Sequence, residues 1–343
     1  MDSTTISSSQ SDFEKSTLGF CYDWLIGKNE FTLSTSGSTG TPKPITLKRK
    51  QMEASAALTI EALQLSNSSN ALVCLDTKYI AGQMMLVRAF VNGMNIIATE
   101  PTANPFKNIS QPIDFTALVP YQVEAILQEG NSANLDALKC CIIGGATISE
   151  SLKKKLKEIK SPMFATYGMT ETISHIALQK LNGDDANENF HVLGDTKISQ
   201  DERGCLMIDA DYLDDQVTTN DLVTITDAKH FTWLGRFDNV INSGGVKVSP
   251  EPIETKIESI FDDEGIFNRC FVAGIPDNKL GQRVALFVEG NPFTQETQKE
   301  ILSKLSSQIS KFEVPKEIRF VSVFEETKTG KVNRLATIRN SKV

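Results

Sequence analysis

Several absences narrow what this chain can be. The sequence has no apolar run of membrane-spanning length, no Cys-x-x-Cys pair and few histidines. Because a bilayer span needs about 20 consecutive apolar residues, we expect no transmembrane helix and no membrane partner. Zinc sites need Cys or His ligands at close spacings, whereas His175, His191 and His230 are scattered along the chain. We therefore assign the histidines to structural or surface positions, with no catalytic role.

The cysteines show no pattern of a disulfide or metal framework. Most of the six lie in apolar stretches, where cysteine behaves as a small hydrophobic residue. Residues 1–16 are polar and lack the basic and apolar regions of a secretory signal peptide. These features predict a reduced, cytoplasmic protein.

Positive charge is in deficit. The chain has 35 Lys and Arg residues against 43 Asp and Glu residues, a formal net charge of −8. Nucleic acids and anionic membranes are bound through basic patches, so we expect neither as a partner, and any bound anion must be held by local geometry. The length of 343 residues favours two domains, and 40% hydrophobic with 23% charged residues is typical of a globular protein.

One segment has the composition of an anion-binding loop. Residues 35–43, Thr-Ser-Gly-Ser-Thr-Gly-Thr-Pro-Lys, lie between the short apolar stretches 31–33 and 45–47. Glycine lets backbone N–H groups turn inward, hydroxyls add donors and lysine adds a cation. The spacing is not that of a Walker loop, so a plain Ser/Gly surface loop is the competing interpretation. The candidate phosphate ligands are Thr35, Ser36, Gly37, Ser38, Thr39, Gly40 and Lys43.

Apolar runs alternate with helical stretches between residues 71 and 168. The runs at 71–75, 95–99, 115–119, 140–143 and 163–166 are typical of buried strands. This alternation predicts an α/β fold with a largely parallel sheet. After Glu171, strand-like runs at 175–178, 205–208, 222–226 and 231–234 lack long helices between them. They predict a further distorted sheet or small barrel.

The pattern changes again beyond Gly235. It predicts a helix over 250–260, strands near 271–273 and 284–288, and a helix over 295–309. Ser249 and Pro250 form a helix entry, with serine as N-cap and proline in the first turn. We therefore expect a large N-terminal domain, residues 1–237, and a small α+β C-terminal domain, residues 238–343, joined by a hinge.

Four segments in order carry a family resemblance. They are the loop 35–43, Tyr-Gly-Met-Thr-Glu-Thr at 167–172, Gly-Arg-Phe-Asp-Asn at 235–239 running on to Ser-Gly-Gly-Val-Lys at 243–247, and Lys-Thr-Gly-Lys at 328–331. Over residues 31–340 the chain resembles the adenylate-forming superfamily of acyl-CoA ligases, luciferases and peptide-synthetase adenylation domains. One such motif is weak evidence, but several in the same order are specific.

The resemblance implies a reaction that uses ATP, Mg²⁺ and coenzyme A (CoA). A carboxylate attacks the α-phosphorus of ATP, and because two anions meet, the barrier is largely electrostatic. By resemblance, Glu171 is a magnesium ligand, Thr170 binds the α-phosphate, and Lys331 bridges the carboxylate and the phosphate. These are the expected catalytic residues. An exposed glutamate after a strand and an ordinary lysine in a Thr-Gly turn are the structural alternatives.

The same resemblance assigns further residues to the nucleotide. Gly144, Gly145 and Ala146 would form a wall beside the adenine and the acyl group, because glycine permits close approach, although a strand that simply ends in Gly-Gly is the alternative. Asp221 would take the ribose hydroxyls, with Thr-Asn-Asp here in place of the family's Thr-Gly-Asp. The resemblance adds Tyr167, Gly168, Met169 and Arg236 to the ATP site.

The last implied roles concern movement and CoA. Asp238 would be the hinge about which the small domain turns between half-reactions, so that Lys331 reaches the site in one orientation only. In the other orientation Gly244, Gly245 and Lys247 would line the path of the CoA pantetheine.

A narrower resemblance suggests the acid. Residues 79–89 and 169–175, the latter reading Met-Thr-Glu-Thr-Ile-Ser-His, are similar to short bacterial o-succinylbenzoate:CoA ligases of menaquinone (vitamin K2) biosynthesis. Arg88 shares a helical face with Ile80, Met84 and Val91 in a run with no other charge, and a buried guanidinium requires an anionic partner.

The partner of Arg88 is left open by the sequence. It is either the second carboxylate of a dicarboxylate substrate or a protein acid such as Asp76, unless Arg88 extends to solvent. Lys78 is a second candidate cation for the acid.

The chain also departs from the family. Its hydroxyl-rich loop begins at Thr35, so most of the subdomain that precedes this loop elsewhere is expected to be absent. Another element, or a partner chain in a homo-oligomer, would have to supply the missing wall, or the pocket would be open. The alternatives to an o-succinylbenzoate ligase are a ligase for another acid, a nucleotide-binding regulator without catalysis, and a scaffolding subunit.

Overall fold

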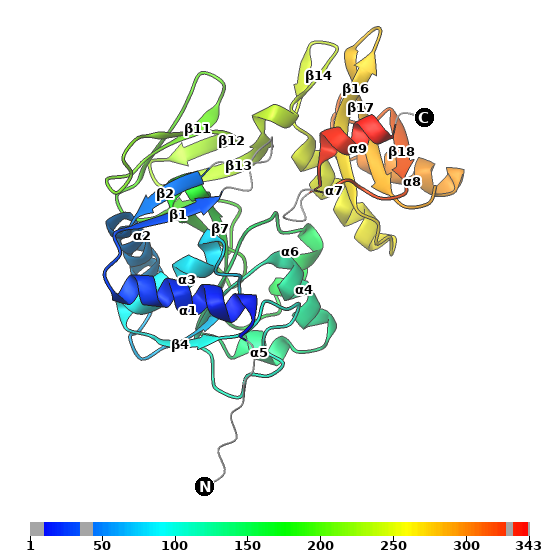
Figure 1. Cartoon of the computed structure of the whole chain (residues 1–343). Coiled ribbons are helices and arrows are strands. Elements are labelled where there is room, and N and C mark those ends of the chain that lie inside the picture. The colour runs from blue at the N-terminus through cyan, green and yellow to red at the C-terminus, as the bar shows by residue number, and fades with distance from the viewer. Residues whose placement is uncertain (1–9, 35–43, 327–331, 342–343) are drawn as a thin grey trace.

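A computed structural model describes residues 10–34, 44–326 and 332–341. An 11-stranded sheet is the centre of the larger body (Figure 1), with strands in the order β10-β11-β12-β13-β9-β8-β7-β6-β5-β3-β4. Its parallel part contains β3 (Asn70–Val73), β4 (Asn95–Ala98), β5 (Phe115–Leu118), β6 (Cys140–Ile143) and β7 (Met163–Gly168). The predicted parallel α/β arrangement is confirmed.

Helices cover both faces of this parallel part. The helices are α1 (Asp12–Leu25), α2 (Arg49–Ala62), α3 (Ile80–Asn92), α4 (Pro120–Gln128), α5 (Ser132–Asp136) and α6 (Glu150–Leu156). Successive strand residues point to opposite faces, so Ala71 joins the core under α2 and α3 whereas Leu72 joins the core under α4 and α6. Strands buried on both sides read as continuous apolar runs, which is why the sequence located them.

The strands after Glu171 extend the same sheet. They are β8 (His175–Lys180), β9 (Phe190–Val192), β10 (Lys197–Gln200), β11 (Cys205–Asp209), β12 (Val217–Asp227) and β13 (His230–Arg236). β8 pairs antiparallel with β7, because the turn with the short helix η1 (Thr170–Thr172) returns the chain directly beside it. The expected further sheet is therefore continuous with the parallel part. β1 (Glu30–Ser34) and β2 (Pro44–Lys48) form a separate antiparallel pair.

A five-stranded sheet follows the short helix η2 (Phe237–Asn239). Its strands are β14 (Ile241–Ser243), β15 (Val246–Val248), β16 (Cys270–Asp277), β17 (Gly281–Glu289) and β18 (Glu317–Val321), with helices α7 (Pro250–Asp263), α8 (Gln295–Ser306) and α9 (Arg334–Asn340). The α+β pattern predicted for this region is confirmed. Ser249 stands at the N-cap of α7, but its side chain makes no capping hydrogen bond.

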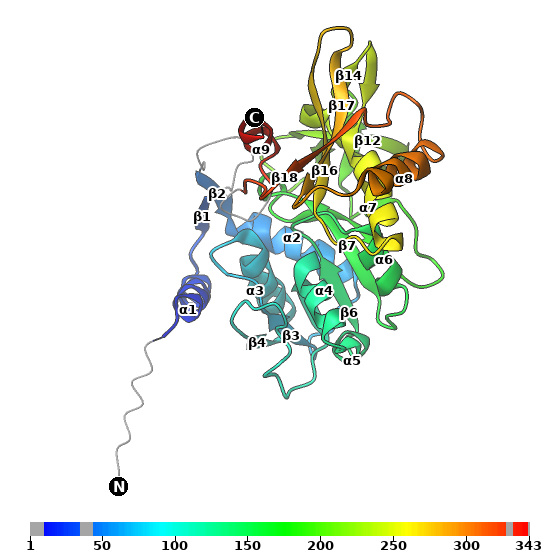
Figure 2. The ribbon, with the colours of Figure 1, turned by 90° about the vertical axis from the view of Figure 1, so that its right-hand side faces the viewer.

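The large sheet ends at Arg236 and the small one begins at Ile241, which brackets the boundary that we propose between residues 237 and 238. α7 packs against β13 and α6, and Figure 2 shows α7 beside α6. Within the described ranges, no helix is long and apolar enough to cross a membrane.

Candidate active site

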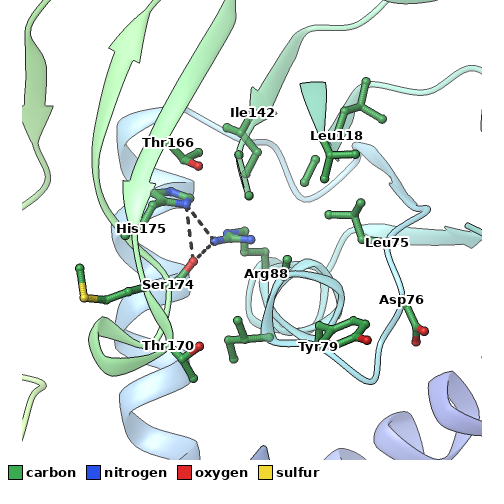
Figure 3. A pocket seen from close by; sticks show the side chains of 18 of the residues that line it. Leu75, Asp76, Tyr79, Arg88, Leu118, Ile142, Thr166, Thr170, Ser174 and His175 are labelled. Atoms are coloured by element: carbon green, nitrogen blue, oxygen red, sulfur yellow. Dashed lines mark hydrogen bonds between the residues drawn. The ribbon is translucent and has the colours of Figure 1, made fainter. Parts of the chain in front are cut away.

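A cavity of about 600 Å³ opens at the carboxyl ends of the parallel strands. Ends of parallel strands are the usual ligand-binding edge of an α/β sheet. Val119, Gly144 and Gly168 contribute from the ends of β5, β6 and β7, and the start of α3 and the turn after β7 close the cavity. Figure 3 shows the side chains of Leu75, Leu118 and Ile142 on its apolar side.

Two glycines are required by the packing around this cavity. A Cβ atom on Gly144 would lie 2.2 Å from Thr166 Oγ1, and one on Gly168 would lie 2.3 Å from the carbonyl oxygen of Ser174. Gly145 adopts a positive φ of 85°, which side-chain-bearing residues rarely take. Gly144 and Gly145 line the cavity, whereas the neighbouring Ala146 is exposed and outside the lining.

The turn after β7 is strained and directs two side chains inward. Ile173 is a buried β-branched residue with φ 68° and ψ −49°, and the Ser174 N–H donates to the Thr172 carbonyl at 2.8 Å. This is the rare form of γ-turn, and such strain is concentrated at functional sites. The turn brings Ser174 and His175 to the cavity, opposite α3 (Figure 3).

Arg88 is buried in the wall of this cavity. Its side chain projects from α3, the residue is 2% exposed, and no carboxylate of a described residue forms an ion pair with it. Nη2 donates to Ser174 Oγ at 2.7 Å and lies 3.4 Å from His175 Nδ1, while Nε is buried with no described partner. Burial lowers the pKa of Arg88 to about 9, so the guanidinium remains a cation at neutral pH.

Two of the options for Arg88 are therefore excluded. Its 2% exposure rules out extension to solvent. The Asp76 carboxylate instead accepts the Lys78 backbone N–H at 2.9 Å, and Figure 3 shows Asp76 on the opposite side of α3 from Ser174. Residues 80–92 form a helix, and along the face that Arg88 was expected to share, Met84 is buried whereas Val91 is 40% exposed.

His175 is a lining residue that the sequence interpretation missed. It is 6% exposed, and its Nε2 lies 3.0 Å from Thr59 Oγ1 on α2. Burial, and then the nearby Arg88 charge, hold its pKa well below the usual histidine value. The sequence did carry one indication of this role: His175 closes the segment 169–175, three residues after the Tyr-Gly-Met-Thr-Glu-Thr motif.

The other candidate cation, Lys78, is not brought into the cavity. It does not line it, and its Nζ lies 3.8 Å from Asp12 Oδ2 with both side chains largely exposed. Lys78 follows β3 at the surface, where a lysine is easily hydrated.

Thr170 and Glu171 lie at the cavity mouth in η1. Thr170 and Met169 line the cavity, and Glu171 is exposed beside them. Among the described residues no group of three acidic, His or Cys side chains could hold a metal ion. Mg²⁺ bound with a nucleotide needs only one or two carboxylates, because phosphate oxygens and water complete its shell. A single exposed carboxylate therefore fits magnesium bound together with ATP.

Tyr167, Asp221 and Arg236 form a hydrogen-bonded group next to the cavity. The Tyr167 hydroxyl donates to Asp221 Oδ2 at 2.7 Å, and Trp233 and Arg236 donate to Oδ1 at 3.3 and 3.4 Å. Burial and the Asp221 charge raise the pKa of Tyr167 above its ordinary value. Arg236 also pairs with Asp238 at 3.2 Å, so the strand β13 and the proposed hinge are linked through one side chain.

The remaining predicted residues lie elsewhere or outside the described ranges. Gly244 and Gly245 form the positive-φ turn between β14 and β15, with Lys247 exposed on β15, and none of the three lines the cavity. The residues that fall outside the described ranges are Thr35, Ser36, Gly37, Ser38, Thr39, Gly40, Lys43 and Lys331. Leu33, at the end of β1, does line the cavity.

Comparison with known proteins points to one enzyme family. The AMP-binding enzyme model matches residues 31–197, and the AMP-binding enzyme C-terminal domain model matches residues 256–331. The crystal structure of an acyl-CoA synthetase (AMP-forming)/AMP-acid ligase II-like protein from Dyadobacter fermentans is 41% identical, covers 97% of this chain and 95% of that one, and gives a TM-score of 0.64.

Two curated relatives are 2-succinylbenzoate–CoA ligases. The probable enzyme of Mycobacterium tuberculosis H37Rv is 26% identical over 329 residues, which are 90% of this chain and 83% of that protein. The enzyme of Staphylococcus aureus MRSA252 is 26% identical over 327 residues, 88% of this chain but 65% of that protein, so the chain spans about two thirds of its length. The family resemblance is thus confirmed, and the chain belongs to the AMP-binding enzyme family, among its acid–CoA ligases.

Proposed function

We propose that this chain is an ATP-dependent ligase that activates o-succinylbenzoate and joins it to CoA, a step of menaquinone biosynthesis. The observation that carries the proposal is Arg88, a cation buried in the cavity wall with no carboxylate partner among the described residues. Such a charge is costly unless an anion meets it.

The shape of the cavity supports an aromatic dicarboxylate. Leu75, Leu118 and Ile142 give it an apolar side that suits an aromatic ring. The ring carboxylate would meet Arg88 and Ser174, and the aliphatic carboxylate would extend toward Gly144 and Thr170, where we place the α-phosphate. Arginine favours carboxylates because its planar donors match their geometry.

The proposed reaction has two steps. An oxygen of the aliphatic carboxylate attacks the α-phosphorus of ATP, and the bond to pyrophosphate breaks. The CoA thiolate then attacks the acyl carbon, and AMP leaves with its electron pair. Thr170 would bind the phosphate, Lys331 would add a cation beside the attacking oxygen, and Gly144 and Gly145 would admit the adenylate closely.

Magnesium would be held by Glu171 together with the phosphates of ATP. When bound, it neutralises the phosphate charge that opposes an incoming carboxylate. Asp221 would meet the ribose hydroxyls through the oxygens that Tyr167 and Arg236 already orient. Gly244, Gly245 and Lys247 are proposed for CoA.

The test is pyrophosphate release by the purified chain with a matched panel of acids. We expect turnover of o-succinylbenzoate, much weaker use of 3-benzoylpropionate, which lacks only the ring carboxylate, and no use of benzoate. Equal turnover of benzoate and o-succinylbenzoate would overturn the dicarboxylate specificity. Release with none of these acids but with a fatty or other aromatic acid would keep the ligase class and change the substrate, and no release with any acid would favour the regulator or scaffold alternatives.

Substitution of Arg88 separates the acid from the nucleotide. In Arg88→Ala we expect the KM for o-succinylbenzoate to rise by about 10- to 100-fold, as for loss of a charge-assisted hydrogen bond. The KM for ATP should hardly change, because we place the phosphates of ATP at Gly144 and Thr170 and only the ring carboxylate of the acid at Arg88. An unchanged KM for the acid would remove Arg88 from the acid site.

A further inference from the structure

The imidazole of His175 connects three elements of the larger body. Its Nε2 lies 3.0 Å from Thr59 Oγ1 on α2, and its Nδ1 lies 3.4 Å from Arg88 Nη2 on α3. Ser174 Oγ, in the turn before β8, is 3.5 Å from the same Nδ1 and accepts from Arg88 Nη2. A ring nitrogen that faces an arginine N–H can only accept.

The contacts of Thr59 fix which nitrogen carries the proton. The Thr59 hydroxyl has one hydrogen, which it donates to the Ser55 carbonyl oxygen at 3.3 Å. Its oxygen must then accept from His175 Nε2–H. This leaves Nδ1 with a lone pair directed at Arg88 and at the Ser174 hydroxyl. The opposite tautomer would place two donors against each other at the Arg88 contact.

The surroundings of His175 also keep it neutral. The charged group that faces it is Arg88, and the other groups in hydrogen-bond contact, Thr59 and Ser174, are uncharged. A second cation beside Arg88 would be repelled, which agrees with the lowered pKa of His175. A neutral acceptor at this place holds the guanidinium without cancelling its charge.

We propose that His175 is a positioning residue for the acid substrate: as a neutral acceptor held by Thr59, it orients Arg88 so that the guanidinium keeps its charge and its unused donors for a ligand carboxylate. This rests on the proposed function. Nη2 is taken by Ser174 and His175, whereas Nε and Nη1 make no hydrogen bond to a described residue. A carboxylate of the protein in place of His175 would neutralise the site, so an acceptor without charge is the group that this role requires.

The kinetic test compares two substitutions at this position. His175→Phe keeps an aromatic ring at this position but removes both nitrogens, and we expect the KM for o-succinylbenzoate to rise about tenfold, as for loss of one positioning hydrogen bond. The KM for ATP and the kcat should stay within about twofold. His175→Asn places an amide oxygen near the position of Nδ1 and should recover most of the affinity.

The matched substrate separates positioning from a general structural effect. With 3-benzoylpropionate, which lacks the ring carboxylate, His175→Phe should change kcat/KM by less than about twofold. An equal loss with both acids, or no loss with o-succinylbenzoate, would overturn the proposal. Circular dichroism and the melting temperature of each variant show whether it is folded.

An NMR experiment tests the protonation state of His175 without any substrate. NMR of the imidazole nitrogens in the full chain, with His175 assigned by the loss of its signals in His175→Asn, should show a neutral ring protonated at Nε2 at neutral pH. The Nδ1 signal should move in Arg88→Met, which removes its donor. Protonation at Nδ1, a cationic ring or an unmoved signal would overturn the role of His175. If the wild-type chain does not use o-succinylbenzoate, the proposed function fails. The NMR experiment would still show which nitrogen of His175 carries the proton and whether Nδ1 contacts Arg88.

Discussion

Arg88 in the cavity wall shows how a residue that favours ligand binding can lower the stability of the free protein. Arg88 carries a charge in a place where the described part of the chain supplies only neutral acceptors, Ser174 and His175. A buried charge without a counter-ion costs free energy in the empty protein, and a ligand carboxylate recovers that cost on binding. The unpaired state of Arg88 is therefore expected to lower the stability of the free enzyme.

Arg88→Met tests this opposition. Replacing an unpaired buried charge with an apolar side chain of similar length should raise the free energy of unfolding by about 1 to 3 kcal/mol, while removing the preference for the dicarboxylate. Ser174 and His175 can still bond each other, since they are 3.5 Å apart. The measurement is urea unfolding followed by tryptophan fluorescence.

Arg49→Met is the matched control. Arg49 pairs with Glu53 at 2.8 Å, donates to the Trp24 carbonyl at 2.7 Å and lies 4.0 Å from the centre of the Trp24 ring. The same substitution there should destabilise the protein by about 1 kcal/mol. If Arg88→Met were destabilising to a similar degree, Arg88 would have to be counted as a structural residue.

At the scale of elements, close packing explains one glycine of the Gly-Arg-Phe-Asp motif. Gly235 has φ 131°, and a Cβ there would lie 2.3 Å from Glu251 Oε2 at the start of α7. Glu251 Oε1 in turn accepts from Asn239 at 2.6 Å. β13, η2 and α7 thus meet at one point beside the proposed hinge.

Gly235→Ala should loosen the packing of α7 against β13. We expect a loss of more than about 2 kcal/mol, from the strained φ together with the clash. Gly265→Ala is the control, because Gly265 also has a positive φ of 68° but has no atom within 4 Å of an added Cβ. Equal losses in the melting temperature of the two variants would mean that backbone strain alone matters and that the approach of Glu251 does not.

A buried carboxyl near the contact between α6 and α7 is expected to make the stability of the protein depend on pH. Burial, followed by the charges of Glu254, Asp262, Glu150 and Glu124, raises the pKa of Glu258 on α7 to about 7. In the unfolded chain this carboxyl titrates near the ordinary glutamate pKa of 4.5. Between these two values the folded state binds more protons than the unfolded state, so stability falls as the pH rises through this window.

Glu258→Gln should remove this part of the pH dependence. Melting temperatures measured between pH 5 and 8 should fall less steeply in the variant than in the wild type, and the variant should be the more stable of the two at the upper end. Glu296→Gln, at the exposed start of α8, is expected to leave the slope unchanged. A wild-type slope in Glu258→Gln would show that this carboxyl does not titrate in the window.

At the scale of the whole molecule, the features that could be predicted from the sequence are those encoded by local residue patterns, such as the positions of strands and helices. Continuous apolar runs located the strands of the parallel sheet, and a helical run with no other charge drew attention to Arg88, with burial and extension to solvent both left open. The partners of Arg88 were not predictable, because Ser174 and His175 are 86 and 87 residues away in the chain and no periodicity encodes such a contact. His175 was set aside because the histidines are scattered, which excludes a metal site but not a single acceptor in a wall.

The continuity of the antiparallel strands with the parallel sheet was not predictable, for a related reason. The runs that became β8, β11, β12 and β13 were located, whereas the short strands β9 and β10 were not. The pairing of β8 with β7 depends on the strained turn at Ile173, and a β-branched residue is not a turn signal. Lys78 was placed in the site because it is near Arg88 in sequence, yet it lies on the surface beside Asp12. Proximity along the chain is a weak guide at the start of a helix, where neighbouring side chains point in different directions.

The two half-reactions give the last prediction, which concerns the arrangement of the whole molecule. Because we propose that the small domain presents Lys331 in one orientation and the β14–β15 turn in another, single substitutions should separate the steps. Lys331→Ala should slow acid-dependent pyrophosphate release by about 100-fold or more and leave thioester formation from preformed acyl-adenylate nearly intact. Lys247→Ala should slow thioester formation and spare pyrophosphate release. Equal loss of both half-reactions in Lys331→Ala would mean that the lysine acts in a single arrangement of the two domains, and the proposed rotation about Asp238 would have to be abandoned.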